Sequence, residues 1–349
     1  MIISFLRELL ELPSVDGKIV CLGGGVGTAQ VLAGLRFYNH QLTAVVSMAD
    51  DGGSAGRLRR AFAVPPPGDI VNCLAALSSE ESIVKKLFIY RFAGNRHGKD
   101  TDIAGQKLGN LIFVALTDIY KGDTNKALEE FSKIISSKGT VVPATLGDVN
   151  IWATTRDGKK VTGEQNIDLG HYNGSKSLYD VHLEPENIRA YGPATKAIED
   201  AKLIVVGPGD LFSTVLPVLI VKQIKKALLK SKAQKVFIVN IANKPFETNS
   251  FKASDYLETL SRHMGGDIFD KIFINTNQKP KIPAKIRYRY VSYDKENLGN
   301  YLPGIIEGDF IDVKYPIYHE SGKIADKLVM LISSKKSPDF NLGMRADSS

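Results

Sequence analysis

The stretch KIVCLGGGVGTAQVLAGLRFY, residues 18–38, decides the fold class. An apolar run at 18–22 is typical of a buried strand, and a helical pattern begins near Ala29 after a glycine-rich turn. Such a turn lets the backbone approach a ligand closely and directs the free N–H groups of the helix start at an anion. A tight turn that binds nothing is the alternative, because the third glycine of the dinucleotide fingerprint is absent. We predict a phosphate-binding turn formed by Gly23, Gly24, Gly25, Gly27 and Thr28.

Apolar runs of the same kind recur along the chain and alternate with helical patterns. The expected strands are 18–22, 42–48, 203–206, 235–240 and 271–275. The expected helices are 29–38, 82–91, 108–120, 125–136, 215–230 and 253–264. This alternation predicts an α/β protein with a mostly parallel, doubly wound sheet, in which crossover helices bury both faces of the strands.

One segment, 141–167, departs from this alternation. It combines short strand patterns with the dipeptide Asp157-Gly158, which favours a hairpin turn, so we expect a small antiparallel hairpin excursion there. Residues 18–332 are expected to form a single domain that includes the excursion. We expect 1–17 to be an N-terminal helical extension and 333–349, rich in Ser, Lys and Asp, to be a flexible C-terminal tail.

The composition excludes several classes of protein. The 349 residues are 43% hydrophobic and can bury a large core, and the net charge of +7 permits anionic ligands without requiring nucleic acid. Cys21 and Cys73 have no paired spacing that would suggest a disulfide framework or a zinc site. No apolar stretch reaches the roughly 18 residues that a membrane span needs. Because charged residues also interrupt the apolar N-terminus, we expect a soluble cytoplasmic protein without a signal peptide.

A second glycine-rich segment, ADDGGSAGRLRR at 49–60, follows the second expected strand. Asp50 lies where dinucleotide-binding folds place a ribose-binding acid. Two adjacent aspartates repel a phosphate, so Asp50 and Asp51 are expected to bind hydroxyl groups, the edge of a nucleobase or a metal ion. Arg57 or Arg59 would then bind the anion.

The centre of the same segment permits two interpretations. In the first, Gly52 and Gly53 line the binding site and Ser54 caps the following helix. In the second, GGSAG is the Gly-x-Ser-x-Gly nucleophile elbow of a hydrolase, and Ser54 pairs with a late histidine such as His319. The turn already explains the glycines, which argues against the hydrolase.

Three further turns place polar residues before an expected helix: PPPGDIVN at 65–72, GQKLGN at 105–110 and VGPGD at 206–210. The prolines fix an extended backbone, which suits a preorganised binding wall. In a doubly wound sheet, the turn at 206–210 would bring a second helix N-terminus to the same sheet edge as the first turn. The loop 94–101 is either a lid or an ordinary exposed loop. The candidate ligand-binding residues of these turns are Gly68, Asp69, Asn72, Asn110, Gly207, Pro208 and Gly209.

In this order, the strings GGGVG, ADDGGSAGRLRR, PPPGDIVNCL, LFIYRF, GQKLGN, VGPGDLFSTVLP and NKPFET resemble the YvcK/CofD family, and most closely its YvcK branch, the gluconeogenesis factors. The resemblance covers about 18–332. It implies a Rossmann-like three-layer α/β/α fold and binding of UDP-sugars such as UDP-N-acetylglucosamine. It also implies a role in carbon metabolism, cell-wall synthesis and cell shape. Lys244, within NKPFET, joins the expected ligand-binding residues.

Some positions depart from the family pattern. The resemblance implies Thr, Arg and His where this chain has Val26, Val71 and Gln106. It also implies Arg where this chain has Tyr318, so one cationic contact to the ligand is missing. None of these positions sets the strand and helix pattern.

Two functions follow as hypotheses. In the first, a regulatory protein binds a nucleotide sugar, with the diphosphate on the first glycine turn. In the second, a CofD-like transferase moves a phospholactyl-type group from a nucleotide-activated donor to a deazaflavin acceptor. Asp50 and Asp51 would then hold magnesium, the one cofactor considered, or steer the acceptor hydroxyl. A dehydrogenase is disfavoured because no hydride-side catalytic residue is identifiable. A homodimer stays open.

Overall fold

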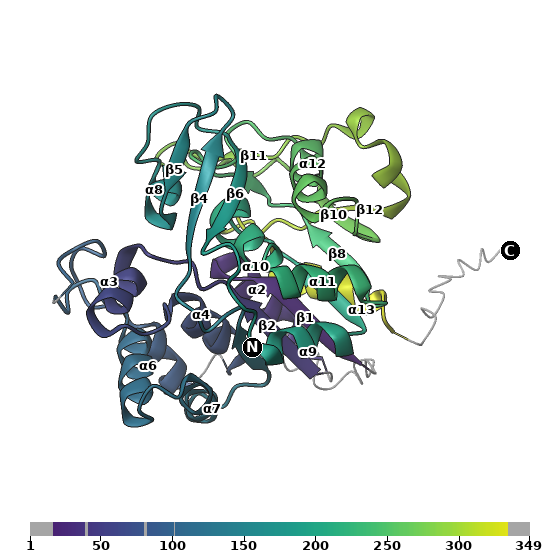
Figure 1. Cartoon of the computed structure of the whole chain (residues 1–349). Coiled ribbons are helices and arrows are strands. Elements are labelled where there is room, and N and C mark those ends of the chain that lie inside the picture. Colours follow the sequence, from purple (N-terminus) through teal and green to yellow (C-terminus); the bar gives the residue numbers. More distant parts are fainter. Residues whose placement is uncertain (1–16, 39–40, 80–81, 101, 334–349) are drawn as a thin grey trace, which may run out of the picture.

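The computed structural model describes residues 17–38, 41–79, 82–100 and 102–333. Apart from Gly17 and Ser333, the expected N-terminal extension 1–17 and the expected tail 333–349 lie outside the described residues. The main sheet has seven parallel strands in the order β12-β10-β8-β7-β1-β2-β3 (Figure 1). These strands are β1 (Lys18–Gly23), β2 (Gln41–Val46), β3 (Thr140–Pro143), β7 (Leu203–Val206), β8 (Gln234–Ile238), β10 (Lys271–Asn275) and β12 (Ile305–Gly308).

The central strands explain why the sheet could be predicted from the sequence. Every side chain of β7 is fully buried, and 19–22 of β1 are at most 1% exposed. Parallel strands covered on both faces read as continuous apolar runs instead of alternating ones. The predicted doubly wound α/β sheet is confirmed.

Helices cover both faces of the main sheet (Figure 1). The helix that follows β1, α2, packs between α4 and α13, and α9 packs against α11 on the opposite face. The helices are α2 (Gly25–Leu35), α3 (Gly53–Phe62), α4 (Gly68–Leu77), α5 (Ile83–Ile89), α6 (Leu108–Ile119), α7 (Thr124–Ile134), α8 (Glu164–Leu169), α9 (Gly192–Asp200), α10 (Leu216–Leu219), α11 (Lys222–Lys230), α12 (Ala253–Met264) and α13 (Ser321–Met330). None of the helices in the described ranges is long and apolar enough to cross a membrane.

A small antiparallel sheet stands beyond one end of the main sheet (Figure 1). Its strands β4 (Asn150–Thr155), β5 (Lys160–Thr162) and β6 (Leu178–Glu184) pair in the order β5-β4-β6, and the expected Asp157-Gly158 turn joins the first two. The excursion therefore runs from 150 to 184 and not from 141 to 167. The earlier part of the expected excursion forms β3, which pairs with β2 at the edge of the main sheet. The apolar side chains of Val141 and Val142 are buried there.

The prediction of a single helix over 215–230 is wrong in detail. A π-helical turn (Leu211–Val215), α10 and α11 succeed one another there. Residues 215–219 are all buried, so the apolar pattern carries no helical periodicity that would show where one helix ends and the next begins. A two-stranded ribbon of β9 (Ala242–Asn243) and β11 (Arg289–Tyr290) lies after β8 in the chain.

Candidate ligand-binding site at the switch point of the sheet

The strand order reverses between β1 and β7, which are neighbours in the sheet. Connections from these two strands leave in opposite directions, which is the position at which doubly wound proteins bind ligands. The two glycine turns meet there: a Cβ on Gly27 would lie 2.4 Å from the carbonyl oxygen of Pro208. Thr28 adds a hydrogen bond, because its Oγ1 donates to the same carbonyl at 3.4 Å. The predicted convergence of the turns is confirmed.

The N–H groups of the first turn have different partners. Gly24 N donates to Thr28 Oγ1 at 2.9 Å, and Gly25 N donates to the carboxylate of Asp69. Gly24 has a φ of +155°, and a Cβ there would lie 2.0 Å from Asp69 Oδ2. Asp69, at the start of α4, therefore already places one anionic group at this helix N-terminus. Burial raises the pKa of Asp69 to about 7.

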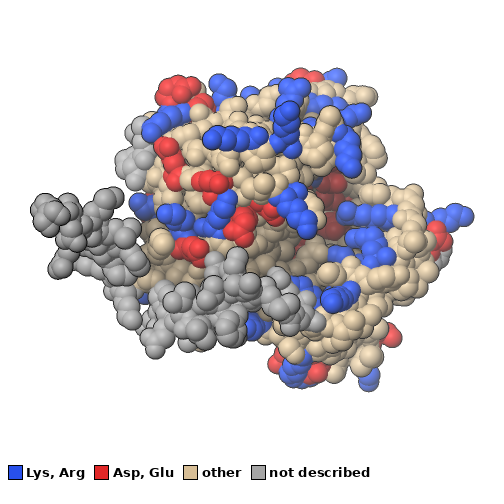
Figure 2. All heavy atoms as spheres, turned by 180° about the vertical axis from the view of Figure 1, so that it is seen from behind, with Lys and Arg blue, Asp and Glu red and all other residues tan. Residues whose placement is uncertain are grey.

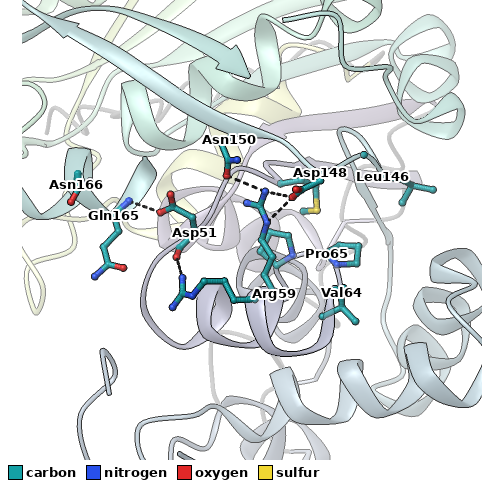
Figure 3. Close-up of a pocket in the computed structure, with 14 residues that line it drawn as sticks. Asp51, Arg59, Val64, Pro65, Leu146, Asp148, Asn150, Gln165 and Asn166 are labelled. Atoms are coloured by element: carbon teal, nitrogen blue, oxygen red, sulfur yellow. Dashed lines mark hydrogen bonds and ion pairs between the residues drawn. The ribbon is translucent and has the colours of Figure 1, made fainter. Parts of the chain in front are cut away.

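The adjacent aspartates Asp50 and Asp51 have separate partners. Asp51 accepts hydrogen bonds from the backbone N–H groups of Gln165 at 2.8 Å and Glu164 at 3.2 Å, at the start of α8 (Figure 3). Asp50 accepts one from Gly52 N at 3.0 Å, and burial raises its pKa to about 6. Each oxygen of Asp51 thus accepts one hydrogen bond from the backbone at the start of α8.

Helix α3 buries the first of its three arginines. Arg57 is 1% exposed, and its guanidinium donates to the carbonyls of Lys99 at 2.6 Å and Ala104 at 2.8 Å. The side chain expected to bind the anion therefore holds the loop that was a candidate lid. Arg59, the alternative, pairs with Asp148 in the groove shown in Figure 3.

The expected roles of Ser54 are not those in the structure. Gly52 is the N-cap of α3, so Ser54 lies inside the first turn, beside Gly53. Its hydroxyl accepts a hydrogen bond from Arg91 at 3.0 Å. His319 lies in a cavity beside the first glycine turn and makes no hydrogen bond to Ser54. The structure therefore does not assemble the nucleophile and base of a hydrolase.

A lysine that the sequence analysis did not single out joins the wall formed by α4. Lys107 Nζ donates to Asn72 Oδ1 at 2.5 Å, and burial lowers the pKa of this lysine to about 8. Its charge also acts on Asp69. Asn110, in the first turn of α6, has a buried side-chain oxygen without a partner within the described residues. The string GQKLGN contains Lys107, but nothing in it distinguishes this lysine from an exposed one.

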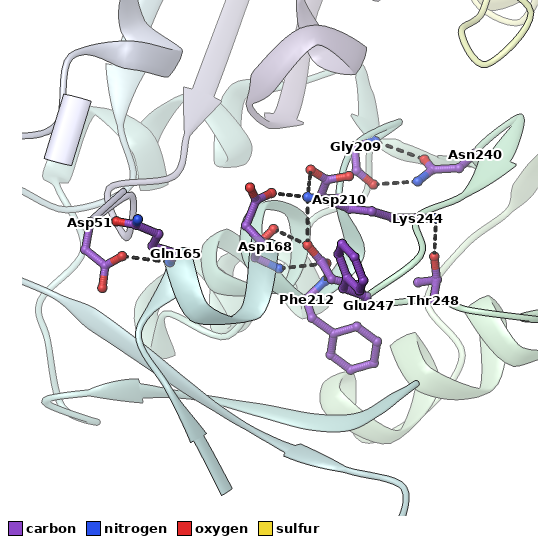
Figure 4. Close-up of polar contacts among 12 residues, drawn as sticks. Asp51, Gln165, Asp168, Gly209, Asp210, Phe212, Asn240, Lys244, Glu247 and Thr248 are labelled. Atoms are coloured by element: carbon purple, nitrogen blue, oxygen red, sulfur yellow. Dashed lines mark hydrogen bonds and ion pairs between the residues drawn. The ribbon is translucent and has the colours of Figure 1, made fainter. Parts of the chain in front are cut away.

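Lys244 lies at the centre of an acidic cluster (Figure 4). Its Nζ contacts the carboxylates of Asp168, Asp210 at 2.6 Å and Glu247 at 3.1 Å. Glu247 is fully buried and also accepts hydrogen bonds from Phe212 N and from Ser213 N and Oγ. These three carboxylates lie close enough together to hold a cation, and the ammonium group of Lys244 is that cation in this structure.

On the face opposite to that of Figure 1, the molecule is hollowed (Figure 2). Acidic side chains lie at the bottom of the hollow, and Lys and Arg border it. Such an arrangement suits a ligand that carries both anionic groups and hydrogen-bond donors.

The fold places the chain in the class of Rossmann-like, doubly wound α/β proteins. The family model of 2-phospho-L-lactate transferase CofD matches residues 19–311, and the chain therefore belongs to the CofD family. The gluconeogenesis factor of Bacillus subtilis is 38% identical over 324 residues, covering 90% of this chain and 98% of the relative. That of Listeria innocua is 36% identical over 324 residues, covering 92% and 97%. The resemblance to the gluconeogenesis factors is confirmed.

Solved structures agree with this assignment. The crystal structure of a UPF0052 family member from Bacillus halodurans has a TM-score of 0.80 and 33% sequence identity to this chain. The two chains align over 89% of this chain and 98% of the Bacillus halodurans protein.

Proposed function

We propose that this chain is a regulatory protein that binds a nucleotide diphosphate of the UDP-sugar type, with the diphosphate at the N-terminus of α2. The observation that carries this proposal is the junction of the two glycine turns at the switch point, where Val26 and Gly27 border a cavity. The N–H groups of a first helical turn have no acceptor within the helix, and the helix dipole favours an anion there.

The family supports an anionic ligand and a metabolic role. The name of the family model denotes an enzyme whose substrate carries a phosphate group, and the relatives are named gluconeogenesis factors. We further propose a cytoplasmic location and a role in carbon metabolism, cell-wall synthesis and cell shape. The relatives' name, gluconeogenesis factor, supports the link to carbon metabolism.

Asp69 is the protein group with which such a ligand must compete. Its carboxylate binds Gly25 N, so an arriving phosphate displaces it or meets it in the protonated form. Because the pKa of Asp69 is about 7, the neutral form is well populated at neutral pH. Ligand binding in this orientation is therefore coupled to the protonation of one side chain.

Isothermal titration with UDP-N-acetylglucosamine tests the proposal, with Val26→Glu and Val26→Gln as a matched pair. Val26 is 49% exposed in the first turn, so neither side chain disturbs the core. We expect Val26→Glu to weaken binding tenfold or more by charge repulsion, and Val26→Gln to leave it within about threefold. An acidic residue in the first turn stabilises a helix, so thermal unfolding should not occur earlier. No heat with the wild-type protein at millimolar ligand would contradict the proposal.

A CofD-like transferase is the second candidate, and a specific observation favours it. Asp50, Asp69 and Lys107 have pKa values of about 6, 7 and 8, so three neighbouring groups can exchange protons near neutral pH. Asp50 would then steer the acceptor hydroxyl, with magnesium supplied in the assay. Incubation with a nucleotide-activated phospholactyl donor and a deazaflavin acceptor tests this candidate, and it fails if no product forms or if Asp50→Asn turns over like the wild type.

A further inference from the structure

Helices α3, α5 and α6 form a layer beside the main sheet whose outer side is apolar. Helix α6 packs against both α3 and α5, and α3 and α6 lie together at one side of the molecule (Figure 1). Six large apolar side chains of this layer, one of them directly after α5, are each between 47% and 66% exposed. We call them the α3–α5–α6 face: Phe62, Ile83, Leu87, Ile89, Tyr90 and Ile119.

Helix α5 gives the strongest indication that something covers this face. Its sequence, IVKKLFI, is apolar except for two lysines, yet only Phe88 is fully buried, with its ring centroid 4.7 Å from that of Phe131. Ile83, Leu87 and Ile89 stay exposed. A surface helix normally has one apolar stripe, and a helix that is apolar on more than one side is normally buried on more than one side. One side of α5 therefore lacks the cover that its sequence indicates.

The packing of the helices joins these side chains into one surface. Leu108 N, at the start of α6, donates to Tyr90 O at 2.8 Å, so the end of α5 lies beside the start of α6. Because the two helices pack against each other, they run in opposite directions, and Ile119 at the end of α6 lies toward Ile83. Helix α3 packs against α6 as well, and Phe62 is its last residue.

The exposed area of the face is that of an interface with a folded protein. An aromatic side chain buries about 150–250 Å² when it is covered, and aliphatic ones somewhat less, so six half-exposed side chains present roughly 500 Å². The largest apolar patch on a typical monomer is about 300–600 Å² and is often functional. Each partner of a standard interface buries about 800 Å², polar rim included. The face therefore has the size of the apolar centre of such an interface.

The charges around the face favour a second copy of this chain over a membrane or a strongly charged partner. Arg60, two residues before Phe62, pairs with Asp100 at 2.9 Å, so these two charges largely cancel, and Lys86 is exposed within α5. An anionic membrane binds clusters of Lys and Arg, and two identical surfaces of one sign would repel each other. A mostly apolar face with little net charge can instead pack against its own copy, as in two-fold dimers.

We propose that the α3–α5–α6 face is the contact between two copies of this chain related by a two-fold axis. In this dimer, Ile83 and Leu87 of each copy are buried against apolar side chains of the other. The inference is independent of the proposed function, since none of the six side chains lines the cavity beside the first glycine turn. A two-fold contact uses the same residues on both copies, so one substitution acts twice in each dimer.

Sedimentation velocity of the full chain at about 1 to 100 µM tests the dimer. We expect the wild type to dimerise and Leu87→Glu to associate about 30-fold or more weakly, because two carboxylates then enter an apolar contact. The matched control is Leu229→Glu, because Leu229 lies on α11 and is 52% exposed, against 47% for Leu87. This control should associate within about twofold of the wild type.

Two further measurements keep the test independent of one variant. Ile83→Glu changes a second exposed position of the face and should weaken association as Leu87→Glu does, and thermal unfolding checks that every variant is folded. Hydrogen exchange gives a local readout: amides of 83–90 and 115–119 should exchange more slowly in the wild type than in Leu87→Glu at the same concentration, whereas those of β8 should not differ.

Three results would overturn the inference. A monomeric wild type at the highest concentration would remove the dimer. Equal association of the wild type, Leu87→Glu and Ile83→Glu would place the contact elsewhere on the molecule. Binding of a monomeric wild type to phosphatidylglycerol vesicles, lost in Leu87→Glu and retained in Leu229→Glu, would assign the face to a membrane surface.

Discussion

At the scale of single residues, Asp69 couples the stability of the fold to the binding site. Its carboxylate occupies the N–H group of Gly25, at the helix terminus where we place the ligand's diphosphate. Burial favours the neutral carboxyl, and the neighbouring Asp50 adds repulsion. The folded protein therefore holds a proton on Asp69 over a pH range in which an exposed aspartate has none.

We predict that Asp69→Asn stabilises the protein at alkaline pH. The folded pKa, about 7, lies above the ordinary value of 3.8, so the stability associated with the neutral carboxyl is complete below pH 4 and is lost as pH rises through 7. Asparagine imitates the neutral form at every pH. Urea unfolding at pH 8 should show a gain of about 2–4 kcal/mol, and less than half of that at pH 5. Asp118→Asn, at an exposed position of α6, serves as the control. A gain that does not change with pH would disprove the assignment.

At the scale of elements, Asp51 connects two parts of the fold that are distant in the chain. It lies in the segment after β2 and accepts hydrogen bonds from the backbone N–H groups of Glu164 and Gln165. Asp51 therefore caps α8 although it does not belong to that helix. Gly163, which precedes α8, lies close to the same carboxylate. The small antiparallel sheet and its helix are thereby joined to the carboxyl edge of the main sheet.

Loss of this cap should loosen the small sheet. We predict that Asp51→Ala costs about 1–2 kcal/mol of stability, the range for a missing helix cap, and that Asp51→Asn costs less because one oxygen remains. Hydrogen exchange of 150–184 should accelerate in Asp51→Ala more than exchange in β1 and β7. Uniform acceleration through the molecule, or none, would show that the carboxylate does not hold α8.

The elements that the sequence analysis predicted correctly are those whose residues are uniform in burial. The strands β1, β7 and β10 are short apolar runs that begin within one residue of their predicted limits, because parallel strands are covered on both faces. The edge strand β3 was assigned to the wrong sheet, since an apolar run does not indicate its partner. The strand β6 was missed because its buried residues Leu178, Val181 and Leu183 do not alternate strictly, and its partner β4 lies in a distant part of the chain.

At the scale of the whole molecule, the candidate site could be predicted where glycine marks it and at single polar residues such as Asp69 and Lys244. The turns at 23–27 and 207–209 were found because few other residues permit such close contact between backbones. Asp168, Asp210 and Glu247 were missed as a cluster, because they are separated by dozens of residues and meet only around Lys244. Arg57 was misjudged because a sequence does not show which way a helix turns its side chains.

The junction of the two turns can be tested with a pair of alanine substitutions. Gly27 and Gly192 both lie in the first turn of a helix, but a Cβ on Gly27 meets backbone atoms of Pro208 and Gly209, whereas one on Gly192 meets nothing within 4 Å. We predict that Gly27→Ala costs about 1–3 kcal/mol by overpacking, and that Gly192→Ala is neutral or stabilises by up to about 1 kcal/mol. Chemical denaturation measures both. Equal effects would mean that the turns do not press on each other.

The close fit between Gly27 and Pro208 also has a mechanical consequence. The turn after β1 cannot be displaced without pushing the turn after β7, since there is no space between their backbones to absorb the movement. The second turn leads directly into the π-helical segment and α10, so the contact joins the turn after β1 to helices of the other half of the molecule. If the first turn binds a ligand as proposed, this contact is where a movement of that turn would reach the second one.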